Sequence, residues 1–184
     1  MSTPKVVLAF DLGHGGTNHG CDVGDVLEKD YVLERGLLLQ EMSEACGVET
    51  FLIRSDDKTL SFAERAAIAD SGGATHVFSL HVNSSANRSW HGALCLAYPG
   101  NRAMKSICES ISSAMPSPLK RYDGARWATP ELWGDSHAVL SAFRQPTALI
   151  ELGFGSNVGD LVSLFDVKLK VLSNLAICAG AVRL

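Results

Sequence analysis

Two histidines and one glutamate stand at the ends of three short apolar runs, where their side chains are placed to do chemistry. His14 follows the first run inside a Gly-His-Gly-Gly segment, His81 follows a second run, and Glu151 closes a third. Any one of them alone is more typical of a turn or a solvated strand end. Because α/β folds bind ligands beyond the carboxyl ends of their strands, we expect the three side chains to lie near one another.

Two imidazoles combined with carboxylates form the ligand set of a catalytic zinc site, which uses three protein ligands and leaves a fourth position open. The third ligand then has to be found among the acidic residues. Glu28, Asp30 and Glu34 all lie at or inside the start of the first predicted helix. Glu28 is the best placed of the three because it is nearest the loop that holds His14.

The other histidines and one cysteine near this region have less direct roles. His19 lies close to the first ligand loop, so contact with substrate or replacement of a ligand stays open for it, and His137 beyond the long loop is similar. His76 is expected to be structural, and His91 is expected to be a loop residue. Cys21 is near the predicted zinc, but a site built from histidine and glutamate needs no thiolate.

The elements that must position these residues alternate between strand and helix along the whole chain. Apolar runs rich in β-branched and aromatic residues predict strands, and apolar residues at helical spacing predict helices. The predicted strands are 5–11, 49–53, 75–80, 92–98 and 147–151, and the predicted helices are 28–46, 61–70, 102–115 and 158–182. This order predicts one α/β domain over residues 1–184, with a twisted, mostly parallel central sheet flanked by helices and the zinc site at the carboxyl ends of the strands.

Residues 116–136 fit neither period. This stretch holds three of the six prolines and two of the three tryptophans, Trp127 and Trp133. Long loops inside a compact domain are usually functional or disordered. We therefore expect a surface excursion with an aromatic wall facing the substrate, the alternative being a packed loop without a role in binding.

Composition limits the class of protein. With 184 residues, 46% of them hydrophobic, the chain can bury a core without a structural metal, so a metal here is expected to be functional. The formal net charge is -4 without a basic stripe, which makes nucleic acid an unexpected partner. Five scattered cysteines do not predict a disulfide framework. The apolar run after the N-terminus is too short for a signal peptide or membrane insertion, so cytoplasmic synthesis is expected.

Four linked motifs resemble those of the zinc-dependent N-acetylmuramoyl-L-alanine amidases, the amidase type 3 family. The order and spacing of the motifs also fit, and the similarity spans nearly the whole chain. One departure is Leu12, where a proline is usual in the family. The motifs are Asp11-Leu12-Gly13-His14-Gly15-Gly16, Leu27-Glu28-Lys29-Asp30, Ser79-Leu80-His81-Val82-Asn83 and Glu151-Leu152-Gly153-Phe154-Gly155-Ser156-Asn157.

The resemblance implies a zinc ion held by His14, Glu28 and His81, with Glu151 as the catalytic carboxylate. The implied reaction is hydrolysis of the amide between the lactyl group of N-acetylmuramic acid and L-alanine in peptidoglycan. The chemistry of the residues agrees, because a carboxylate on a separate strand can face the open metal position and act as general acid and base. Asp11 is expected either to orient a zinc-bound histidine or to make a structural hydrogen bond.

Within the family, the chain is expected to be a phage or prophage endolysin, because no signal peptide and no separate wall-binding domain are found in it. Such an enzyme waits in the host cytoplasm as a monomer and reaches the cell wall after the inner membrane is permeabilised. Two alternatives stay open. One is a zinc peptidase or deacetylase acting on another wall-derived substrate with the same residues, and the other is a non-catalytic wall-binding relative.

Overall fold

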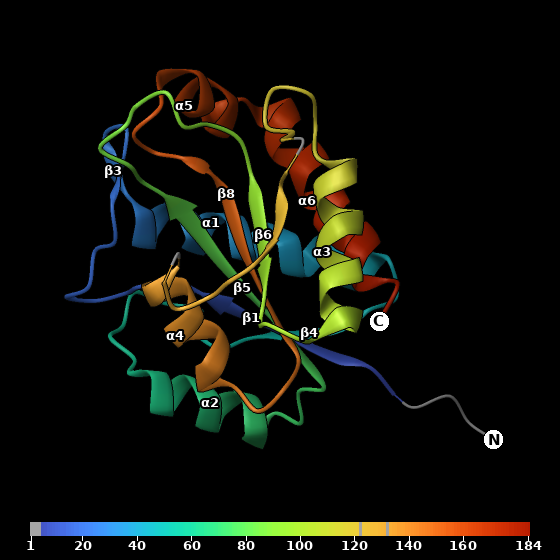
Figure 1. Ribbon diagram of the computed structural model, residues 1–184. Coiled ribbons are helices and arrows are strands. Elements are labelled where there is room, and N and C mark those ends of the chain that lie inside the picture. Colours follow the sequence, from blue (N-terminus) through green and yellow to red (C-terminus); the bar gives the residue numbers. More distant parts are fainter. Residues whose placement is uncertain (1–4, 122, 132) are drawn as a thin grey trace.

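A six-stranded sheet runs between two layers of helices in the computed structural model, which describes residues 5–121, 123–131 and 133–184 (Figure 1). Neighbouring strands are parallel, except that β6 runs antiparallel to β8. The predicted single-domain α/β class with a mostly parallel sheet is therefore confirmed. In spatial order the strands are β4 (Glu49–Leu52), β1 (Val7–Leu12), β5 (His76–Asn83), β8 (Thr147–Phe154), β6 (Leu94–Ala97) and β7 (Ala125–Trp127).

The two faces of the sheet bury different sets of side chains, because successive residues of a strand point to opposite faces. Phe10, Phe78 and Ile150 belong to the larger core, which lies under α1 (Glu28–Ala45), α3 (Arg102–Ala114) and α6 (Val167–Ala181). Val77 and Leu149 belong to a smaller core under α2 (Phe62–Ser71) and α4 (Gly134–Ala142) (Figure 1). The odd-numbered positions of β5 and β8 thus face α2 and α4.

Local capping explains why the predicted helices begin and end close to their expected positions. Ser61 precedes α2, where its hydroxyl accepts a hydrogen bond from the Glu64 N–H at 3.3 Å and the Glu64 carboxylate accepts one from the Ser61 N–H at 2.7 Å. This reciprocal pair satisfies two backbone donors that a helix start leaves free. At the end of α1, Gly47 takes a φ of +81°, a conformation that glycine adopts without strain.

The last predicted helix is two helices. α5 (Val158–Phe165) ends at Asp166, whose backbone is extended, and α6 begins directly after it. The Asp166 carboxylate accepts a hydrogen bond from the Leu169 N–H at 2.8 Å and so caps the second helix. The apolar spacing runs through both helices, so periodicity alone did not predict the break.

The prediction of a surface excursion over residues 116–136 is wrong for its central part. Residues 125–127 form β7 at the edge of the sheet, and α4 begins at Gly134. Trp127 is half-buried and packs against the larger core, while Trp133 packs against the smaller one. Tyr122 and Leu132 lie outside the described residues. Trp127 is therefore a packing residue rather than part of a substrate-facing wall.

A small hairpin that the sequence did not predict leads the chain into α1. It consists of β2 (Asp22–Val23) and β3 (Val26–Leu27), joined through Gly24 at a φ of +63°. Because β3 is followed at once by Glu28, the hairpin fixes where the first residue of α1 lies.

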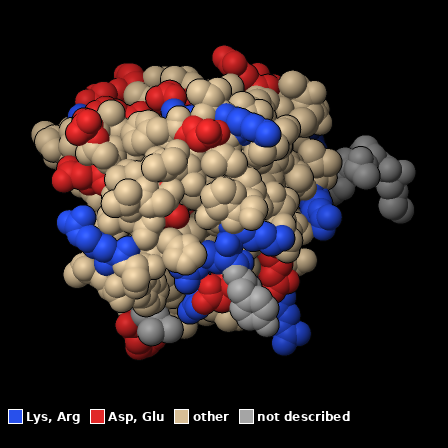
Figure 2. All heavy atoms as spheres, turned by 90° about the horizontal axis from the view of Figure 1, so that it is seen from above, with Lys and Arg blue, Asp and Glu red and all other residues tan. Residues whose placement is uncertain are grey.

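The surface seen from above in Figure 2 is uncharged over most of its centre, with acidic and basic side chains close together around the edges. A carboxylate is visible inside a hollow of this face. Among the helices of residues 5–121, 123–131 and 133–184, none combines the length and the hydropathy needed to span a bilayer.

Candidate metal and catalytic site

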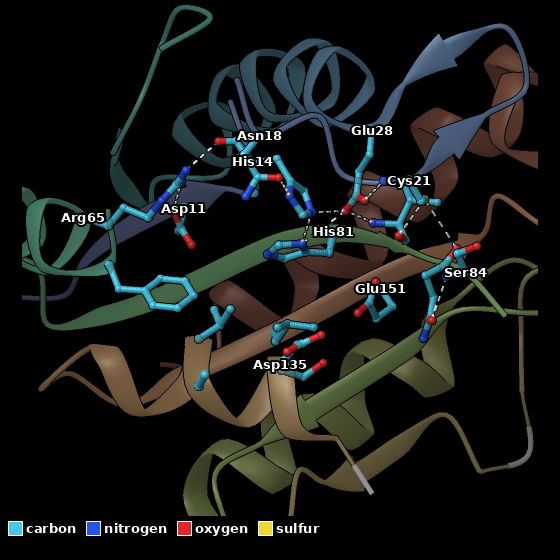
Figure 3. A pocket seen from close by; sticks show the side chains of 18 of the residues that line it. Asp11, His14, Asn18, Cys21, Glu28, Arg65, His81, Ser84, Asp135 and Glu151 are labelled. Atoms are coloured by element: carbon cyan, nitrogen blue, oxygen red, sulfur yellow. Dashed lines mark hydrogen bonds and ion pairs between the residues drawn. The ribbon is translucent and has the colours of Figure 1, made fainter. Parts of the chain in front are cut away.

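His14, Glu28 and His81 lie close together at the carboxyl ends of β1 and β5 and the start of α1, as the sequence predicted (Figure 3). His14 Nε2 lies 3.1 Å from Glu28 Oε1, and His81 Nδ1 lies 3.2 Å from the same oxygen. The two ring nitrogens are 3.3 Å apart. One ligand atom from each residue lies within 4.8 Å of the others, so all three can reach a single cation.

Glycines let the three side chains approach so closely. A Cβ added to Gly13 would lie 2.3 Å from His81 Cε1, and one added to Gly20 would lie 2.4 Å from Glu28 Oε2. His14 itself has a φ of +60°, which is uncommon for a residue with a side chain. Glycine is thus needed at positions 13 and 20, because a side chain at either position would collide with His81 or Glu28.

The carboxylate of Glu28 is fixed from several sides. Its Oε1 accepts a hydrogen bond from the Val82 N–H and its Oε2 from the Cys21 N–H, each at 2.9 Å. Burial raises the pKa of this carboxyl, but the hydrogen bonds from His14 and His81 outweigh burial and lower it. Glu28 is therefore an anion between two imidazoles.

The donor set of this cluster fits a divalent cation. Two imidazole nitrogens and one carboxylate converge on one point. Burial lowers the pKa of His14, but its hydrogen bond to the Glu28 carboxylate and the charge of that group raise it by more. Convergent electron-pair donors of this kind need a positive charge between them. Two histidines and a glutamate with a fourth position open are one of the ligand sets that catalytic zinc sites use.

Glu151 lies beside this cluster on the neighbouring strand. Its Cα pairs in register with that of His81 across β5 and β8, and both residues line one cavity of about 500 Å³ (Figure 3). The side chain is 7% exposed, and its Oε2 has no hydrogen-bond partner among the described residues. Burial, and to a smaller extent the charge of Glu28, raise the pKa of Glu151 well above its usual range. The carboxyl group is therefore suited to take up a proton.

Two buried arginines hold the glycine-rich loop in place. The Arg54 guanidinium donates to the carbonyl oxygens of Leu12 at 2.7 Å and Gly13 at 2.8 Å. Arg65 donates to Asp11 Oδ1 at 2.6 Å, and Asp11 Oδ2 accepts from the Ser79 hydroxyl at 2.7 Å. Of the two roles expected for Asp11, the geometry matches the structural hydrogen bond.

The residue that orients His14 is one that the sequence did not single out. Asn18 Oδ1 lies 2.9 Å from His14 Nδ1, on the side of the ring opposite Glu28. A backbone bridge between Gly15 and Asn18 closes the turn that brings the amide there. Histidines that bind metals commonly donate their second ring N–H to such an acceptor. The short spacing between His14 and Asn18 was therefore the signal in the sequence that could have identified Asn18.

Replacing Asn18 with alanine is expected to weaken divalent-metal binding by about tenfold. Residues that orient a metal ligand commonly contribute about 10- to 100-fold. The lower value is expected because this hydrogen bond is exposed to solvent. Competition with a chromophoric chelator measures the change. His19→Ala is the matched control, since His19 is an exposed neighbour whose backbone, but not its ring, is used in the turn. Equal affinity in wild type and Asn18→Ala would show that the contact does not orient His14.

Asp30, Glu34 and His137 are not part of the cluster of His14, Glu28 and His81. Asp30 is exposed, and Glu34 pairs with Lys170 at 2.8 Å. The ring of His137 packs at 5.1 Å from that of Tyr98. Cys21 does line the cavity, but burial and the neighbouring Glu28 raise the pKa of its thiol, which keeps it protonated and a poor ligand.

Comparison with known proteins places this arrangement in a family. The family model for N-acetylmuramoyl-L-alanine amidase matches residues 8–181. The chain is 32% identical over 165 residues to the N-acetylmuramoyl-L-alanine amidase CwlM of Bacillus licheniformis, covering 86% of this chain and 60% of that protein. It thus spans less than two thirds of that relative's length.

Solved structures agree with the family match. The amidase AmiC2 of Nostoc punctiforme aligns with a TM-score of 0.82 and 26% identity, over 98% of this chain and 97% of that one. The catalytic domain of CwlV from Bacillus (Paenibacillus) polymyxa aligns with a TM-score of 0.80 and 25% identity, over 95% of each chain. With a family model that matches almost its whole length, the chain belongs to the N-acetylmuramoyl-L-alanine amidase family that the motifs resembled, amidase type 3.

Proposed function

We propose that this chain is a zinc-dependent amidase that hydrolyses the amide between N-acetylmuramic acid and L-alanine in peptidoglycan. The observation that supports it most is the joint placement of His14, Glu28 and His81 around one point, with the buried Glu151 on the adjoining strand. The family match favours the same activity.

His14, Glu28 and His81 would hold the zinc ion. An amide is a weak electrophile and water a weak nucleophile, and a zinc ion bound there would polarise the carbonyl group and lower the pKa of the attacking water. The anionic Glu28 compensates part of the ion's charge, and its hydrogen bonds to the Val82 and Cys21 N–H groups fix its two oxygens.

Glu151 moves the proton. Its carboxylate takes a proton from the attacking water at Oε2, the oxygen that has no partner among the described residues, and then returns this proton to the departing amine nitrogen of L-alanine. Burial and, to a smaller extent, the Glu28 charge raise the pKa of Glu151, which favours the carboxyl form that holds the proton between the two transfers.

The direct test is digestion of purified peptidoglycan with the purified chain. The proposed activity releases stem peptides that begin with a free L-alanine amino group, which mass spectrometry and amino-terminal labelling detect. Release of acetate, or peptides cut internally, would instead identify a deacetylase or a peptidase. Binding to the wall without any release of product would identify a non-catalytic relative.

Removal of the metal is expected to stop hydrolysis but leave the fold. The two apolar cores close on both faces of the sheet without using the ligand residues, so chelation with EDTA should leave the circular dichroism spectrum almost unchanged. Added zinc should restore the activity. Unfolding on chelation would contradict this prediction, because it would make the metal structural rather than catalytic.

We further propose that the chain reaches peptidoglycan as a monomeric lysin of a phage or prophage. The curated relatives include bacterial amidases, so this role and the expected cytoplasmic synthesis stay predictions. Expression in a bacterial host with and without a co-expressed holin tests them. Lysis only after the holin opens the inner membrane is expected, and lysis without a holin would contradict the proposal.

A further inference from the structure

A second hollow, of about 250 Å³, opens beside the proposed catalytic cavity. Asn83 and Ser84 line both spaces, so a ligand held in the cavity can extend across these two residues into the hollow. The far side of the hollow is aromatic. Its other lining residues are Ser85, Trp90, Arg126, Trp133 and Phe154.

Trp90 offers its ring to solvent although it is firmly supported. The residue is 44% exposed and lines the hollow. Its ring meets that of Phe154 edge to face, with centroids 6.3 Å apart. The Arg121 guanidinium lies 5.9 Å from the Trp90 ring and 6.0 Å from the Phe154 ring, so it braces both.

The loop that presents Trp90 is tied to the turn between β8 and α5. The Ser85 N–H donates to the Ser156 hydroxyl at 3.0 Å, and the Asn157 side chain donates to the Arg88 carbonyl oxygen at 2.8 Å. At the end of the loop, the Gly92 N–H donates to the buried Asp160 carboxylate at 2.7 Å. The aromatic ring is thus preorganised, which lowers the entropy lost when a ligand packs on it.

The charge of the hollow decides what kind of ligand it fits. Arg126 is its charged side chain, and the guanidinium is paired with the carboxylate of Asp123, which also pairs with Arg121 at 3.1 Å. The remaining polar groups are the neutral side chains of Asn83, Ser84 and Ser85. A guanidinium engaged in an ion pair, neutral hydrogen-bonding groups and an exposed aromatic side chain together suit a ring with one apolar side and several hydroxyl groups.

We propose that this hollow is a sugar subsite, in which Trp90 packs against one face of a pyranose ring of the glycan strand. The inference rests on the proposed function, because the sugar is the acyl-side neighbour of the amide that the cavity would hold. Asn83 and Ser84 lie where the substrate passes from the cavity to the hollow. Trp90 is accordingly a specificity-determining residue for glycan-linked substrates.

Kinetics with and without the sugar test the proposal. A disaccharide-linked stem peptide is compared with an N-lactoyl-L-alanyl peptide, which has the same scissile amide but no sugar. Trp90→Ala should lower kcat/KM about tenfold on the first substrate, the loss that truncation of one stacked aromatic side chain commonly brings, and leave the second unchanged. Trp90→Phe should keep most of the activity. Phe165→Ala, which removes a ring of similar exposure, 42%, on α5, is the matched control and should affect neither substrate.

The outcomes separate the subsite from the activity. An equal loss on both substrates would make Trp90 a structural or peptide-binding residue, and no loss on either would overturn the subsite. If the wild type hydrolyses neither substrate, the proposed function fails. The subsite is then decided by saturation-transfer NMR with the neutral disaccharide of N-acetylglucosamine, which should bind the wild type and Phe165→Ala but not Trp90→Ala. Equal binding to all three would overturn it.

Discussion

Glu151→Gln is expected to reduce the turnover of peptidoglycan at least about 10²-fold while leaving bound zinc in place. The amide keeps the volume of the side chain and hydrogen-bonds, but it cannot accept a proton from water at neutral pH. Glu151 is not among the three residues whose ligand atoms converge, so its loss should not release the metal. Turnover and KM measured on a muropeptide, with zinc content by mass spectrometry, check the prediction.

The stability of this variant gives a second, independent readout. Burial raises the pKa of Glu151, so the native state favours the protonated form, and the stability that this form contributes is lost as the pH rises through the raised pKa. The melting temperature of the metal-free wild type should therefore fall relative to that of metal-free Glu151→Gln as the pH increases. Near-full activity of the variant, or loss of its zinc, would remove Glu151 from the role of proton carrier.

The sequence predicted that His14 and His81 would lie close together because each stands at the end of an apolar run. Parallel strands bring their carboxyl ends to one edge, which is why His14 and His81 meet without further information. The choice between Glu28 and its neighbours depended on where α1 begins. The structure adds the cause, since the hairpin before α1 leads straight into Glu28.

The parts that sequence reasoning missed depend on tertiary contacts. β7 has three residues, too few to show a period, and it forms because the edge of β6 offers backbone partners. Asp166 breaks the last helix through a cap that apolar spacing does not report. The sequence analysis did not single out Trp90, because its support comes from Phe154 and Arg121, which lie far away in the sequence.

His81→Ala is expected to fail in a different way, by losing the metal itself. Removing an orienting partner of a ligand weakens binding by about 10- to 100-fold, so removing a ligand should weaken zinc binding by more than about 10²-fold and abolish turnover. The fold should persist, because Glu28 keeps its hydrogen bonds from the Val82 and Cys21 N–H groups. Zinc content after dialysis, circular dichroism and peptidoglycan digestion are the measurements. His137→Ala, on α4 against Tyr98, is the control.

The double variant His81→Ala/Glu151→Gln separates a shared mechanism from two unrelated losses. If Glu151 acts on water only when zinc is bound, the second substitution should cost almost nothing once the metal has gone, because residues that act as a unit have non-additive effects. If the two fold-losses multiply instead, Glu151 contributes to hydrolysis without the ion. A His81→Ala protein that retained one zinc per chain and its activity would exclude His81 as a ligand, and the cluster would then need a third donor other than His81.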